Sequence, residues 1–201
     1  MKQVTLALTA LVCAAWPIPT VLAADKPIEA RKVLLRDPVD DTQRRFNFIS
    51  RDPNITFGSN GDSDTPSAHG ASLLVFNPVT SECQCIQIGL NGWSIGPDGK
   101  RYVYHDTPLL YGPVKQIVMK AGKLKIAGLG AGLSITLDET SQGEIAVHYT
   151  SGTANKLCAH FPGATVRVDR PTAFVAVGGP VPAACLPEPA ACSPCVPPAL
   201  P

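Results

Sequence analysis

The sequence predicts an all-β protein: an antiparallel β-sandwich of about ten to twelve short strands, followed by a Pro/Cys-rich C-terminal tail. Apolar and polar residues alternate with period two in many short runs, and no helical stripe of useful length interrupts them. With 17 Gly and 20 Pro among 201 residues, a helix bundle is a poor alternative. A hydrophobic content of 45% and a formal net charge of +1 exclude a charged disordered chain.

The expected strands follow from local patterns. Leu133, Ile135 and Leu137 alternate with polar residues, as do Ile145, Val147 and Tyr149, and each run predicts a strand with one buried face. The turn residue Gly122 separates two runs that form a hairpin candidate. The run 73–76 is apolar on both faces and is therefore expected in the middle of a sheet. The strands expected are 33–35, 46–49, 73–76, 86–90, 101–104, 114–120, 123–126, 133–137, 145–149, 166–168 and 174–177.

The ends of the chain differ from this domain. Residues 1–23 have the pattern of a signal peptide cleaved after Ala23, with Lys2 before an apolar run and a proline breaker behind it. Residues 24–29 form a leader, residues 30–178 the β-sandwich domain, and residues 179–201 a tail with eight prolines that is expected to be extended. The protein is therefore expected to be secreted, into the periplasm or the extracellular space.

The charge of the chain argues against two classes of partner. Processing removes Lys2, and 17 − 1 = 16 basic residues then face 16 acidic ones, with neither sign concentrated in one segment. We therefore expect no binding to nucleic acid, and no membrane contact after signal cleavage. For an exported domain, a cell-envelope protein or a polysaccharide then stays possible as a partner.

The cysteines are the strongest chemical feature. Six remain after processing, and an even number in an oxidising compartment favours disulfides. Cys83 and Cys85 lie two apart and project to one strand face, so each is expected to pair elsewhere. A bond between Cys158 and Cys185 would fasten the start of the tail to the sheet. Two alternatives remain open, a zinc site from two close pairs and a redox-active pair at Cys192 and Cys195.

Several segments resemble an uncharacterised family of secreted bacterial β-rich domains: FISRDP at 48–53, HGASLLVFN at 69–77, Trp93, SQG at 141–143 and KLCAHF at 156–161. No activity is established for that family, so the resemblance implies export and a β fold rather than a reaction. It also implies a cysteine pair bracketing the hairpin. This chain has Val114 and the Ala127-Gly128 step at those positions.

Other constellations are weak. The four histidines form no His-x-x-x-His pair and no Gly-x-Ser-x-Gly elbow occurs, so we expect no metal, no cofactor and no catalytic set. His148 is expected to be a solvated strand residue. Asn60, Asp62 and Asp64 alternate as in calcium loops, but the Glu such a loop requires is missing, which favours a polar surface loop.

Three function classes follow. The first is a non-catalytic structural or interaction module of the cell envelope. The second is a carbohydrate-binding module, in which an exposed Trp93 would form a stacking platform with Tyr102, Tyr104 and Tyr111; core packing is the alternative interpretation of these rings. The third is an enzyme with loop-borne acids, for which Asp106, Asp138 and Glu139 are the only candidates.

Overall fold

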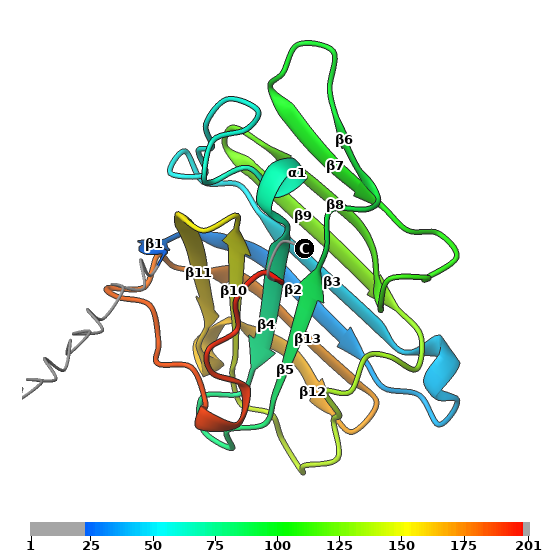
Figure 1. Ribbon diagram of the computed structural model, residues 1–201. Helices are drawn as coiled ribbons and strands as arrows, with labels where there is room; N and C mark the ends of the chain where they lie inside the picture. Colours follow the sequence, from blue (N-terminus) through cyan, green and yellow to red (C-terminus); the bar gives the residue numbers. More distant parts are fainter. Residues whose placement is uncertain (1–22, 199–201) are drawn as a thin grey trace, which may run out of the picture.

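The computed structural model describes residues 23–198 and confirms an all-β, sandwich-like fold of two mostly antiparallel sheets (Figure 1). The predicted signal peptide, apart from Ala23, lies outside the described residues. The five-stranded sheet runs β1 (Ala24–Pro27), β11 (Asn155–Phe161), β10 (Ile145–Ser151), β4 (Ala71–Phe76) and β5 (Cys83–Ile88). The eight-stranded sheet runs β12 (Val166–Arg170), β13 (Ala173–Gly179), β2 (Ala30–Arg36), β3 (Arg45–Ser50), β9 (Lys123–Leu129), β8 (Val114–Lys120), β7 (Arg101–His105) and β6 (Trp93–Ile95).

In the part of the chain that the structure describes, helical structure is confined to single turns in the connections. They are η1 (Asp41–Gln43), α1 (Pro66–His69), η2 (Gly163–Thr165) and η3 (Ala190–Cys192). No helix within residues 23–198 has the length and apolar character to cross a membrane.

The core lies between the two sheets and is formed by alternate residues of each strand. Phe46 and Phe48 of β3 and Phe161 of β11 are almost fully buried, and the rings of Phe48 and Phe161 meet edge to face across the sandwich. Period-two alternation explains this arrangement, because each strand turns one set of side chains inward. The same alternation turns a second set outward.

Two predicted features are confirmed. The hairpin β8–β9 turns through Gly122, whose φ of +70° favours glycine. All six residues of β4 are buried, and β4 lies between β10 and β5 as expected of a central strand.

Three expectations at the strand level were wrong. The leader forms the edge strand β1, which pairs in parallel with β11. Residues 133–137 form no strand. Their apolar side chains are buried, but the side chains of Gln84, Glu82 and Asp37, rather than a neighbouring strand, accept the backbone N–H groups at 134, 136 and 137. In β10 all seven residues are buried, so it has two covered faces instead of one.

Candidate functional site

The C-terminal tail covers the outer face of β10, β4 and β5. Three disulfides attach it: Cys83–Cys192, Cys85–Cys195 and Cys158–Cys185. The predicted Cys158–Cys185 bond is confirmed, as is the expectation that Cys83 and Cys85 each pair elsewhere. Cys192 and Cys195 are not bonded to each other, so the redox-pair alternative fails. The three disulfides fit a protein of an oxidising environment.

Beneath the tail lies a small second apolar cluster. Leu74, Phe76, Ala146 and Cys195 are buried together there, on the side of the sheet opposite the main core. The tail also contains η3, so it is not wholly extended as expected. In Figure 1 the tail, in red, crosses in front of β10 and β4.

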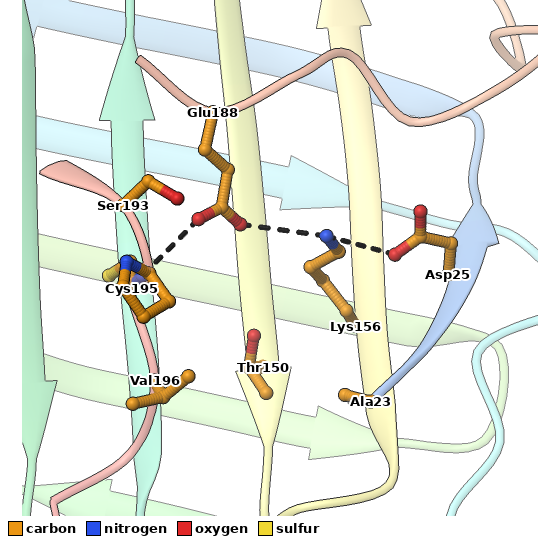
Figure 2. A pocket seen from close by; sticks show the side chains of 9 residues that line it. Ala23, Asp25, Thr150, Lys156, Glu188, Ser193, Cys195 and Val196 are labelled. Carbon is orange, nitrogen blue, oxygen red and sulfur yellow. Dashed lines mark hydrogen bonds and ion pairs between the residues drawn. The ribbon is translucent and has the colours of Figure 1, made fainter. Parts of the chain in front are cut away.

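His148 is buried at 2% exposure, and the expectation of a solvated strand residue was wrong because the tail covers it. Its Nδ1 lies 3.4 Å from Oε1 of the tail residue Glu188. The same Oε1 lies 3.6 Å from Nζ of Lys156, which pairs in turn with Asp25 at 2.9 Å. Figure 2 shows Glu188 directed toward Lys156 and toward the backbone N–H of Cys195.

This network borders a cavity of about 380 Å³ between the tail and the sheet. The hydrogen bond with His148, the N–H of Cys195 and the charge of Lys156 hold the pKa of the Glu188 carboxyl below its usual range, although partial burial opposes this. The charged groups of the cavity therefore satisfy one another. Their arrangement fixes the tail to the sheet and leaves no unpaired charge among Asp25, Lys156 and Glu188 for a ligand.

One group of possible metal ligands lies nearby. Asp25, Cys158 and Cys185 place their ligand atoms within 4.8 Å of one another. The two sulfurs are bonded to each other, however, so neither is a thiolate that could bind zinc.

The aromatic residues proposed as a sugar platform do not form one. Tyr102 and Tyr104 are fully buried, because they occupy the inward positions of β7, and burial raises the pKa of Tyr104 to about 12. Trp93 lies in β6, is half-buried rather than exposed, and packs against Tyr104 at 5.3 Å between ring centroids. Tyr111 lies apart on the β7–β8 loop, about half exposed.

The three nominated carboxylates bind groups of their own loops. Asp106 is buried and accepts the N–H groups of Leu110 and Tyr111. Asp138 accepts a bond from Thr136, and Glu139 one from Gln142. Each side chain therefore has a local structural role.

Hydrogen bonds to its own carboxylates likewise hold the polar loop 58–64 in place. The Asp64 carboxylate accepts the N–H of Gly58 and a bond from Asn155, while Asp62 accepts the N–H of Ser59. These contacts agree with the polar surface loop that the sequence favoured over a calcium loop.

The outer face of the eight-stranded sheet concentrates positive charge, which we did not predict. We call its outward basic residues the basic face. Two rows of them lie at opposite ends of the strands. Arg101 is opposite Lys120, which is opposite Lys123, and at the other end Arg36 is opposite Arg45. The basic face comprises Lys32, Arg36, Arg45, Arg101, Lys120, Lys123, Lys125 and Arg170.

Among the described residues, the basic face has no countercharge of its own. By strand alternation, β2, β3, β7, β8, β9 and β13 direct no acidic side chain outward, and Asp169 of β12 pairs with the inward-facing Phe174. Within residues 23–198 none of the eight basic side chains forms a salt bridge. Like charges directly opposite one another on a sheet are destabilising. The positions Arg36–Arg45, Arg101–Lys120 and Lys120–Lys123 therefore cost the fold stability.

Aliphatic side chains make up most of the surface between the two basic rows. One transverse row passes from Val103 through Val118, Lys125 and Ile49 to Lys32. The next row passes from Val175 through Leu34, Asn47, Ala127 and Gln116 to His105, so it is aliphatic at one end and polar at the other. The face thus has a mainly aliphatic middle, with two lysines and a few polar residues within it, and basic ends.

Comparison with known proteins assigns the chain to no family. The chain matches no family model, no curated protein and no solved structure. Function therefore has to be argued from the surface itself.

The sequence carried a signal for the basic face that we did not use. In the run from Lys123 to Ile126, the two lysines alternate with the inward residues Leu124 and Ile126. Arg101 and Arg45 likewise lie next to inward aromatic residues of their strands. Collecting the outward residues of every predicted strand, rather than counting charges along segments, would have separated the basic positions from the acidic loops.

Proposed function

We propose that the protein is a secreted, non-catalytic interaction module of the cell envelope that binds an anionic partner through the basic face. The observation that carries the proposal is the presence of eight basic side chains on one sheet face, for which residues 23–198 provide no acidic neighbour on that face and no ion pair. Since three like-charged cross-strand contacts are unfavourable in the free protein, a partner's negative charge would relieve them.

Export is supported by the signal-peptide pattern and by the three disulfides. The carbohydrate-platform alternative has less support, because the Tyr102 and Tyr104 rings pack in the core and offer no face for stacking.

The proposal is tested with dextran sulfate as the anionic probe and uncharged dextran as its control, by isothermal titration at about 50 mM salt. We expect binding to dextran sulfate and no binding to uncharged dextran. The variant Lys120→Gln/Lys123→Gln should weaken it about fivefold for each charge, the upper end for an exposed ion pair.

A matched variant, Lys26→Gln/Arg31→Gln, removes the same charge elsewhere. Lys26 is in β1 of the other sheet, and Arg31 points to the opposite side of β2 from Lys32. Equal weakening by both variants, or no binding by the parent, would contradict the proposal.

A further inference from the structure

We infer that the anionic partner of the basic face is a lipid bilayer surface carrying acidic headgroups. The inference rests on the proposed function and names its partner. It replaces the expectation of no membrane contact, which depended on the absence of any concentrated charge.

The spread of charge over the face favours a surface over a linear chain. On β9, Lys123 lies in one basic row and Leu129 pairs with Arg45 of the other row. Six residues of an extended strand separate the rows by about 20 Å. Across the strands, the basic positions extend from Arg170 on β12 to Arg101 on β7. A polyanionic chain can follow one row, whereas a bilayer presents headgroups to both rows at once.

The chemistry between the rows also fits a headgroup layer. The outward residues there are mainly aliphatic, such as Leu34, Ile49 and Val118, and the aromatic residues of these strands are directed inward. The face carries the imidazole of His105 but, in the described strands, no outward Phe, Tyr or Trp ring, so it offers little for sugar or base stacking. The aliphatic stems of lysine and arginine can lie along such a surface while their charges reach the phosphates.

A second copy of the chain is a poor occupant. Face-to-face contact would bring basic residues against basic residues, and the face has no acidic side chain to compensate. Charge complementarity therefore selects a partner that is itself anionic.

Exposed apolar residues lie at the end of the strands that carries Arg36 and Arg45. Val39 in the β2–β3 connection is fully exposed, and Leu110 on the β7–β8 loop is 73% exposed. These two connections meet at Gly130, whose N–H bonds to the carbonyl of Arg44 and whose α-carbon lies near the Leu109 side chain. Binding at a bilayer interface strengthens with the apolar area buried and with the attraction of basic residues to acidic lipids, so exposed apolar loop tips beside a basic surface fit such a partner.

Acidic residues reduce the charge at that end. Asp40 and Asp41 lie beside Val39. We call the opposite row, Arg101, Lys120 and Lys123, the lysine row. Arg101 and Lys120 of this row line a cavity in which Asp98 is the one acidic residue. We therefore expect the lysine row to supply the larger share of the attraction.

The test is co-sedimentation of the disulfide-bonded protein with vesicles of phosphatidylcholine alone or with about a third phosphatidylglycerol. We expect binding only to the anionic vesicles, weakening as salt rises because exposed charges are screened. Lys120→Gln/Lys123→Gln should weaken binding about 25-fold, or about fivefold per charge. Lys26→Gln/Arg31→Gln should leave it unchanged.

The outcomes separate this inference from the proposed function. Binding to dextran sulfate through the same lysines, with no binding to anionic vesicles, would overturn the bilayer and retain an anionic chain as partner. Vesicle binding that responds equally to both variants would overturn the basic face as its site. Failure to bind either probe would overturn the inference and the proposed function together.

Discussion

The two disulfides Cys83–Cys192 and Cys85–Cys195 should be strongly coupled in their effect on stability. Each joins β5 to the tail, and alone each closes a loop with a sequence separation of 109 or 110 residues. The chain-entropy model gives about 5 kcal/mol for a loop of that length. Once one bond is present, the other closes only the short ring made by residues 83–85 and 192–195, which is worth about 2 kcal/mol.

We therefore expect Cys83→Ala/Cys192→Ala and Cys85→Ala/Cys195→Ala each to lower the free energy of unfolding by about 2 kcal/mol. The variant lacking both bonds should lose about 7 kcal/mol, so the two pairs of substitutions are coupled by about 3 kcal/mol. Urea unfolding at neutral pH without reductant measures each value.

Cys158→Ala/Cys185→Ala is the matched control. Its loop spans a separation of 27 residues, so its loss is about 3.5 kcal/mol by the same model. Because its ring does not depend on the other two bonds, this loss should add to that of either single pair. Losses of about 5 kcal/mol from each of the first two variants, adding without coupling, would refute the reasoning. The losses of the two single-pair variants already distinguish these outcomes, even if the variant that lacks both bonds fails to fold.

Three further predictions concern the tail and the β6 edge. Glu188→Gln should lower the free energy of unfolding by about 2 kcal/mol at neutral pH, because it weakens hydrogen bonds to a charged group. The folded-state pKa of Glu188 is lowered, so this difference is fully present above about pH 4.3, the pKa of an unfolded glutamate, and shrinks as pH falls through the folded pKa. Urea unfolding across that range, with Glu29→Gln as an exposed control, measures it, and a difference that grows in acid would have the wrong sign. Trp93→Ala should cost about 2 kcal/mol, less than a fully buried tryptophan, because the ring is half-buried against Tyr104; a variant as stable as the parent would mean that the ring does not pack. Removing residues 196–201 should cost less than about 1 kcal/mol, since Val196 is 43% exposed and its carbonyl accepts one 3.3 Å bond from Gln87; a fall in Tm of more than several degrees would refute this.

Strand positions could largely be predicted from the sequence, because alternation directly reports one buried face. The misses have a physical cause outside the local pattern. Residues 133–137 alternate as a strand does, but the carboxylate of Glu82 and the amide oxygen of Gln84 take the place of a neighbouring backbone. Likewise, the covered outer face of β10 depends on Glu188 and the cysteines of the tail, which lie far away in the sequence.

The candidate site was missed for a related reason. Lys32, Arg101 and Lys125 lie in three separate strand runs, each balanced along the chain by acidic residues of the following loops. Pairing of the strands places these basic residues on one face, while acidic residues such as Asp37 and Asp106 stay at the strand ends and bind loop groups. A charge count along the sequence averages over both sets, and only strand register separates them.

The most direct test of the basic face as a binding surface is acetylation footprinting of lysines, read by mass spectrometry, with and without dextran sulfate. The account predicts protection of Lys32, Lys120, Lys123 and Lys125 when the probe is bound, and unchanged labelling of Lys26 in the other sheet. Protection of Lys26 without protection of the lysine row, or equal labelling everywhere in the presence of bound probe, would contradict it.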